Sequence, residues 1–148
     1  MLVECAQDNE ILLTPERHIS FTVDHAALNT ISEFSADPKL VQQAVNNLLD
    51  NAAKYSYPET DVFISAQRSS GEVLLTVTNY GLPIRPQEVS KCLEHGWRGE
   101  QAKMVTVGSG IGLWVVDSIM KAHKGSVLIS PTTFEGQTKV HLVFPLNK

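Results

Sequence analysis

The sequence predicts an α+β fold, a two-layer sandwich in which helices cover one face of a mixed, mainly antiparallel sheet. Three observations support this prediction. Strand and helix patterns follow one another in the order strand, helix, two strands, helix, two strands. Glycine-containing turns separate the two strands of each pair, which favours antiparallel hairpins. The one long helical pattern, residues 40–55, is apolar on a single side, as expected for a helix that packs on a sheet.

The chain begins with a weakly patterned stretch, residues 1–17, which we interpret as an upstream remnant or linker. The domain would then span residues 18–148. Its first strand is expected over residues 18–24, because apolar and polar side chains alternate there. A second short extended piece is expected over residues 31–34.

The long helix should begin at Asp37 and Pro38. Asp37 provides an N-cap acceptor, and Pro38 suits the first helical position, where its missing N–H costs nothing. The helix should run to about Tyr55 and stop before Pro58. Its apolar side is formed by Val41, Ala44, Val45, Leu48, Ala52 and Tyr55.

The polar side of this helix is unusual, because it carries two carboxamides one turn apart, Asn47 and Asn51, with Lys54 beyond them. Asparagine competes for backbone hydrogen bonds, so each one inside a helix costs about a few tenths of a kcal/mol. An amide oxygen can ligate a hard cation, and a lysine one turn on can meet a phosphate. The alternative is an ordinary surface helix rich in asparagine.

The rest of the chain supplies the remaining strands and a second helix. The first pair of strands is expected over residues 61–67 and 72–78, around a turn at residues 69–71. The second pair is expected over residues 126–130 and 138–146, around a turn near residues 135–136. Between the two pairs we expect a glycine and proline loop at 79–84, a short helix at 86–94, a mobile polar loop at 97–107, and a helix that opens at 108–112 and runs to about His123.

Composition describes one globular domain of 148 residues, 43% hydrophobic and 19% charged. A net charge of -4 provides no basic face, so we expect neither nucleic-acid binding nor membrane contact from this segment. No apolar run approaches the roughly 18 residues of a membrane span, and the first residues lack a signal-peptide pattern. Cys5 and Cys92 lie outside any metal-binding spacing, so reduced cytosolic thiols are favoured over a disulfide.

The glycine run GSGIGL, residues 108–113, precedes the second helix, where backbone N–H groups can approach an anion. It lacks the GK[ST] of a Walker loop. A dinucleotide-binding turn is also disfavoured, because Leu113 stands where the third glycine is needed and Ser130 where the acid is needed.

Together these motifs resemble, in order, the ATP-binding fold shared by gyrase, the 90-kDa heat-shock chaperone, mismatch-repair ATPases and sensor histidine kinases. The catalytic domain of histidine kinases is the most similar. NLLDNAAKYS (47–56) resembles its N box, CLEHGWRGE (92–100) its F box, GSGIGL its second glycine box, and GQTKVHLVFPL (136–146) its closing strand.

The resemblance implies a role for each matching residue. Asn51 would ligate the Mg²⁺ that bridges the ATP phosphates, and Asn47, Lys54 and Arg98 would lie near the metal and phosphates and serve catalysis. Asn79 would accept a hydrogen bond from the adenine amine. The remaining ATP contacts would come from Tyr55, Gly81, Ile84, Gly108, Ser109, Gly110, Ile111, Gly112 and Leu113, the first three around the base and the others in the second glycine box.

The sequence departs from the family's first glycine box, DxGxG, at two positions. Asn79 replaces the aspartate; its amide oxygen can still accept from the adenine amine, but without charge assistance, which weakens the bond by about 1 kcal/mol. Pro83 fixes φ and removes a donor, so the loop should be stiffer. Variants of this kind are familiar among histidine kinases, so we expect a working site.

The resemblance implies a protein histidine kinase catalytic domain that binds Mg²⁺ and ATP in two-component signal transduction. None of the five histidines lies in the pattern of a dimerisation helix. The acceptor would therefore belong to a histidine-containing dimerisation or phosphotransfer domain of the parent kinase, with a response regulator downstream. The domain would be cytoplasmic, in a parent that can be membrane-anchored. The alternatives are a serine kinase of the anti-sigma-factor type and a non-catalytic nucleotide-binding module.

Overall fold

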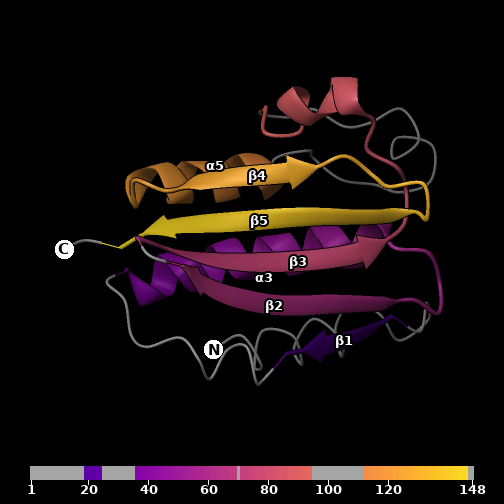
Figure 1. The fold of residues 1–148 in the computed structure, drawn as a ribbon, viewed down its shortest axis with the longest axis horizontal. Helices are drawn as coiled ribbons and strands as arrows, with labels where there is room; N and C mark the ends of the chain where they lie inside the picture. The colour runs from indigo at the N-terminus through magenta and orange to yellow at the C-terminus, as the bar shows by residue number, and fades with distance from the viewer. Residues whose placement is uncertain (1–18, 25–35, 70, 95–111, 147–148) are drawn as a thin grey trace.

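A five-stranded sheet forms one layer of the molecule (Figure 1). The computed structural model describes residues 19–24, 36–69, 71–94 and 112–146. Its strands are β1 (Ser20–Val23), β2 (Asp61–Ser69), β3 (Glu72–Tyr80), β4 (Ser126–Ser130) and β5 (Gln137–Pro145), in the order β1-β2-β3-β5-β4. β1 pairs with β2 in parallel and every other pair is antiparallel, which confirms the predicted fold class.

Two α-helices, α3 (Pro38–Tyr55) and α5 (Gly112–Ala122), lie on one face of this sheet, behind it in Figure 1. The predicted start and end of α3 are confirmed. Asp37 caps the helix, since its Oδ1 accepts hydrogen bonds from Lys39 N at 3.0 Å and Leu40 N at 3.3 Å. Pro38 occupies the first turn, as expected.

The core lies between the sheet and the two helices. Alternate side chains of β2, β3 and β5 point into it, among them Val62, Ile64, Val73, Leu142 and Phe144. On α3 the buried set includes the expected apolar stripe except for Tyr55, which is half-buried, and extends to Leu49 and Ala53. The buried side of α3 is wider than the apolar pattern of the sequence predicts, because α3 packs against α5 as well as the sheet.

The structure changes the bounds of several predicted elements. β3 continues through Asn79 and Tyr80, which were expected to begin a loop, because these residues pair with Thr138 and Gln137 of β5. The short helix is a 3-10 helix, η1 (Pro86–Lys91), and ends before residue 94. The predicted extended piece at 31–34 and the loop at 97–107 lie outside the described residues.

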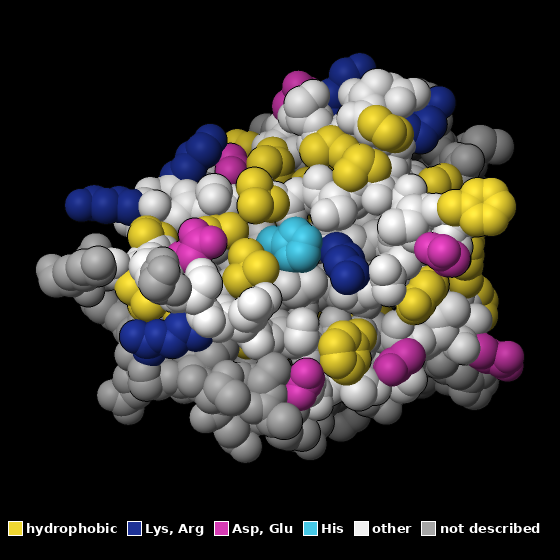
Figure 2. Space-filling model, in the orientation of Figure 1, with side chains coloured by type: hydrophobic (Ala, Val, Ile, Leu, Met, Phe, Trp, Pro, Cys, Tyr) yellow, Lys and Arg dark blue, Asp and Glu magenta, His cyan; other side chains and the backbone are white. Residues whose placement is uncertain are grey.

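None of the described helices covers the other face of the sheet, which Figure 2 shows with hydrophobic side chains scattered among polar ones. His141 lies on this face between two hydroxyls, with Thr76 Oγ1 2.8 Å from its Nδ1 and Ser130 Oγ 3.4 Å from its Nε2. Burial, followed by the charge of Lys139, lowers the pKa of His141. His141 therefore bridges three neighbouring strands as a neutral side chain.

Candidate functional site

The C-terminal half of α3 presents the two predicted carboxamides. Asn47 and Asn51 are half-buried and lie one turn apart, beside the buried side of the helix. Lys54 Nζ lies 3.1 Å from Asp50 Oδ2 in an i,i+4 pair, with 40% and 35% of the two side chains exposed. A pair this exposed contributes about 0.3–0.5 kcal/mol, so Asp50 itself holds the Lys54 ammonium only weakly.

The end of α3 is joined to the end of β3 by two backbone hydrogen bonds, which together make one antiparallel bridge. Ser56 forms an isolated antiparallel bridge with Gly81. Tyr57 N donates to Tyr80 O at 2.9 Å, and Leu82 N donates to Tyr55 O at 2.8 Å. The carboxamide helix and the loop after β3 therefore form one rigid corner, which brings together two segments that the sequence separates.

Gly81 is required at this corner by sterics. A Cβ at this position would lie 1.9 Å from Tyr55 O and 2.7 Å from Ser56 Cα, both backbone atoms that cannot move aside cheaply. The resemblance implies that Gly81 keeps the loop close to a base. The structure gives a second reason for the glycine, namely the close approach of β3 to the last turn of α3.

Asn79 is the last inward-facing residue of β3, following Val73, Leu75 and Val77 on the side that faces the helices. Its Nδ2 donates to Ser56 Oγ at 3.3 Å. The fully buried Ser56 uses its one hydroxyl proton on Ala52 O at 2.6 Å, so its oxygen must act as the acceptor toward Asn79. Ser56 thereby orients the amide, with Nδ2 toward the helix and Oδ1 directed elsewhere.

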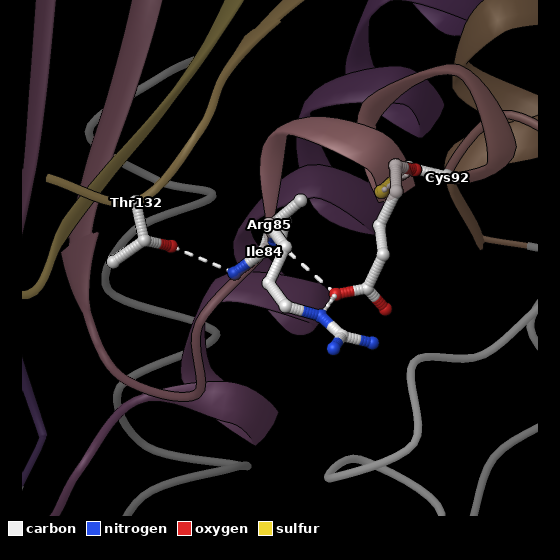
Figure 3. Close-up of polar contacts among 5 residues, drawn as sticks. Ile84, Arg85, Cys92 and Thr132 are labelled. Atoms are coloured by element: carbon white, nitrogen blue, oxygen red, sulfur yellow. Dashed lines mark hydrogen bonds and ion pairs between the residues drawn. The ribbon is translucent and has the colours of Figure 1, made fainter.

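The loop after Gly81 is anchored at Ile84 and Arg85 (Figure 3). Ile84 N donates to Thr132 Oγ1 at 2.7 Å. Arg85 donates to Glu88 Oε1 from its backbone N at 3.2 Å and from its Nε at 2.8 Å. Cys92 Sγ donates to Glu88 O at 3.3 Å. These contacts hold Ile84 between η1 and the β4–β5 connection.

Glu88 is a buried carboxylate in this anchor, with a relative exposure of 7%. Its burial raises the pKa. The Arg85 side-chain and backbone hydrogen bonds, together with the charges of Arg85 and Lys91, outweigh that effect and hold the pKa of Glu88 below its usual value. Glu88 is therefore ionised at neutral pH and continues to accept both Arg85 hydrogen bonds.

The second helix, α5, packs antiparallel to α3, and this packing sets the level of its N-terminus along α3. Asp37 N donates to His123 Nε2 at 3.0 Å, so the start of α3 meets the end of α5 and the helices run antiparallel. The 11 residues of α5 extend about 16 Å from that shared end. The same distance along α3 reaches the turns that hold Asn47 and Asn51. Gly112, the first residue of α5, therefore lies at their level.

Gly112 and Leu113 differ in how closely the described residues pack around them. A Cβ on Gly112 would meet no atom of the described residues within 4 Å, whereas Leu113 beside it is buried. The other predicted members of the phosphate side, Arg98, Gly108, Ser109, Gly110 and Ile111, lie outside the described residues. The structure thus places Asn47, Asn51 and Lys54 on the C-terminal half of α3, with Gly112 at a similar level along that helix, and Tyr55, Asn79 and Gly81 at its end.

The sequence reasoning missed three residues of this site, namely Ser56, Glu88 and Thr132. Ser56 closes the N-box motif and could have been noticed for that reason. Glu88 stands three residues after Arg85, the spacing of a helix-capping pair. Thr132 is 48 residues from Ile84 and no local pattern marks it.

A family model described as "Histidine kinase-, DNA gyrase B-, and HSP90-like ATPase" matches residues 36–148. The chain belongs to this ATPase family. The match covers α3, the corner at Gly81 and both helices of the candidate site.

Individual relatives of this ATPase domain include a sensor protein and a sensor histidine kinase. The sensor protein CzcS of Cupriavidus metallidurans is 34% identical over 113 residues, which cover 76% of this chain and 24% of CzcS. The structure of the mycobacterial sensor histidine kinase MprB superposes with a TM-score of 0.76 at 27% identity, covering 99% of this chain and 95% of that one. Full-length ShkA in complex with AMPPNP has a TM-score of 0.81 at 19% identity, covering 99% of this chain and 29% of that one.

The chain is therefore an ATP-binding catalytic domain of the two-component sensor histidine kinase type, as the sequence predicts. It spans about a quarter of the length of CzcS. Within the described ranges, no helix is long and apolar enough to cross a membrane. No three His, Cys, Asp or Glu side chains of the described residues gather where they could hold a metal ion.

Proposed function

We propose that this domain binds Mg²⁺–ATP along the C-terminal half of α3 and presents the γ-phosphoryl group to a histidine on a separate dimerisation or phosphotransfer domain. A response regulator would then receive the phosphoryl group. The antiparallel packing of α3 and α5 carries the proposal, because it sets Gly112 at the level of Asn47 and Asn51 while Asn79 lies at the helix end. A nucleotide lying along α3 would place its phosphates near Asn47 and Asn51 and its base near Asn79, at the C-terminal end of the helix.

On the phosphate side, Asn51 would ligate Mg²⁺ through its amide oxygen, with Asn47 beside it toward the metal's waters. Carboxamide oxygens suit a hard cation that keeps several waters and takes its other ligands from phosphates. Bound Mg²⁺ neutralises developing phosphate charge. Lys54, released from Asp50, would add a positive charge, and Arg98 would act from the F box.

The N-terminus of α5 would complete the phosphate side. Its backbone N–H groups have no intrahelical partners, and the positive end of the helix dipole favours anions. No atom of the described residues lies within 4 Å of a Cβ built on Gly112, so none of them would block a phosphate there. Gly108, Ser109, Gly110 and Ile111 precede it in the sequence and would extend the same cradle.

On the base side, Asn79 Oδ1 would accept a hydrogen bond from the adenine amine. Ser56 already occupies one N–H of the amide, and this contact favours the orientation that leaves Oδ1 available. Tyr55 and Ile84 are half-buried and would flank the base. The AMPPNP in the ShkA complex supports binding of an adenine nucleotide in this fold. Because ATP and response regulators are cytoplasmic, we place the domain on that side of any membrane.

Calorimetric titration of the domain with Mg²⁺–ATP tests the site. Asn51→Ala and Asn79→Ala should each weaken binding, by at least about tenfold for Asn51 because a metal ligand is lost. Gln43→Ala is the matched control, since it removes an exposed carboxamide two turns from Asn51 on the same helix. Unchanged affinity in both asparagine variants would reject the site.

Phosphoryl transfer to a supplied cognate dimerisation domain tests the activity. The label on the acceptor should be lost in acid, as expected for phosphohistidine. Acid-stable label would indicate a serine kinase, and ATP binding without transfer would indicate a nucleotide-binding module.

A further inference from the structure

We propose that Thr132 is a positioning residue for nucleotide recognition, holding Ile84 at the base side of the site through its hydroxyl group. The inference rests on the proposed function, because it assigns a role within the same site. Thr132 lies in the connection between β4 and β5, far in sequence from Ile84.

Thr132 and Ile84 are joined by two reciprocal hydrogen bonds. Thr132 N donates to Ile84 O at 2.9 Å, and Ile84 N donates to Thr132 Oγ1 at 2.7 Å. The pair resembles one rung of a β-ladder in which a side-chain hydroxyl replaces a backbone carbonyl. Figure 3 shows Thr132 reaching across to Ile84 at the start of the η1 anchor. One of the two hydrogen bonds therefore depends on the Thr132 hydroxyl, which a substitution can remove.

A second hydroxyl, that of Thr138, connects Thr132 to the sheet. Thr132 Oγ1 lies 2.6 Å from Oγ1 of Thr138, which is 3% exposed. Thr138 pairs in register with Asn79 across β5 and β3. A threonine hydroxyl has one proton and two lone pairs. Thr132 Oγ1 uses one lone pair for Ile84 N, and it can still donate to Thr138 Oγ1 or accept from it. These hydrogen bonds connect Ile84 through Thr132 to Thr138, the residue of β5 that pairs with Asn79.

Pro83 makes this connection important. The loop from Gly81 to Ile84 has few donors that could hold it, because Pro83 has no N–H. Leu82 N donates to Tyr55 O and Ile84 N donates to Thr132 Oγ1, so the loop is held at one end by α3 and at the other by Thr132. The Ile84 side chain is half-buried and packs against the edge of the core, so the Thr132 hydrogen bonds add to a partial packing contact.

The test compares Thr132→Val, which keeps the shape and removes the hydroxyl, with Thr132→Ser, which keeps the hydroxyl. Thr133→Val is the matched control. Thr133 Oγ1 also accepts a backbone N–H, from Gln137 at 3.2 Å, but Thr133 is exposed and its hydrogen bonds are made to Gln137 and Gly136, not to Ile84. Three quantities are measured in each variant: the dissociation constant for Mg²⁺–ATP, its ratio to that for Mg²⁺–GTP, and the exchange rate of the Ile84 amide proton.

Thr132→Val should weaken Mg²⁺–ATP binding about five- to tenfold, because a half-buried donor loses its acceptor and the loop loosens. The preference for ATP over GTP should fall and Ile84 amide exchange should accelerate. Thr132→Ser and Thr133→Val should remain within about twofold of wild type. If Thr132→Val does not fold, Thr138→Val removes only the far hydroxyl and should show the same pattern with smaller changes.

Wild-type affinity and selectivity in Thr132→Val would overturn the inference while leaving the proposed function intact. An equal loss in Thr132→Ser would also overturn it, since the hydroxyl would then not be the cause. A wild-type domain that binds no Mg²⁺–ATP would instead overturn the proposed function, and this role with it.

Discussion

The two sides of the candidate site are built differently. On the base side, the corner at Gly81 is held by backbone contacts to Tyr55 and Ser56, and Ile84 is held by Thr132. On the phosphate side, Asn47, Asn51 and Lys54 extend from α3, and Gly112 is the first residue of α5. The base side is fixed by hydrogen bonds between loops and strands, and the phosphate side by the geometry and packing of two helices.

The two glycines show the difference most directly. A Cβ on Gly81 would lie 1.9 Å from a backbone oxygen, whereas a Cβ on Gly112 would meet no atom of the described residues within 4 Å. Substitutions on the base side should therefore reduce stability together with binding. Substitutions on the phosphate side should reduce binding alone.

The largest expected effect is that of Gly81→Ala. The added methyl group would force α3 and β3 apart, and we expect a loss of about 3 kcal/mol or more in the free energy of unfolding. Denaturant unfolding followed by circular dichroism measures it. A wild-type unfolding midpoint would mean that the corner is less tightly closed than the structure shows.

Gly112→Ala should have the opposite character. Alanine is a better helix former than glycine, so stability should be unchanged or rise by up to about 1 kcal/mol. Affinity for Mg²⁺–ATP should fall about tenfold, because the methyl group crowds the approach to the α5 N-terminus. Unfolding and calorimetry on the same sample separate the two effects. A loss of stability without a loss of affinity would contradict the distinction between the two sides.

Ser56→Ala should have a smaller effect on both quantities. Asn79 would lose the acceptor that orients its amide, with an expected cost of about 1 kcal/mol in stability and a lower preference for ATP over GTP. Ser118→Ala is the control, since Ser118 Oγ makes the same kind of bond to the carbonyl four residues earlier, Trp114 O, at 2.9 Å on the exposed side of α5. Equal nucleotide preference in the two variants would remove Ser56 from base recognition.

The smallest effect concerns Cys92, behind the base-side anchor. Burial, followed by the charge of Glu88, raises the pKa of the Cys92 thiol from 9.0 to about 11. Because the folded pKa is raised, the contribution to stability is complete below pH 9 and is lost as the pH rises from 9 to 11. In a Cys5→Ser background, Cys92 should react slowly with a thiol reagent at pH 8 until the protein unfolds. Rapid reaction in the folded state would show that the anchor opens.

Sequence reasoning predicted the bounds of α3 correctly because their determinants are local. Asp37 and Pro38 define where α3 starts, and the spacing of Asn47 and Asn51 then places them on one face. The fold class followed from hairpin turns and element order. Whether the predicted residues bind nucleotide stays a prediction.

The base side could not be predicted in the same way, because its contacts join distant segments. Asn79 meets Ser56 over 23 residues, and Ile84 meets Thr132 over 48. The resemblance singles out Gly81, but the steric reason for a glycine there is the nearby backbone oxygen of Tyr55, which a sequence motif does not reveal.

An NMR titration tests the two-sided site most directly, by following the side-chain amides of Asn51 and Asn79 and the backbone amide of Gly112. Mg²⁺–ATP should shift all three signals with one dissociation constant. Mg²⁺–tripolyphosphate should shift Asn51 and Gly112 only, and adenosine should shift Asn79 only. If Mg²⁺–ATP left these signals unchanged while shifting residues of the opposite sheet face, such as His141, the nucleotide would bind elsewhere and the account would be wrong.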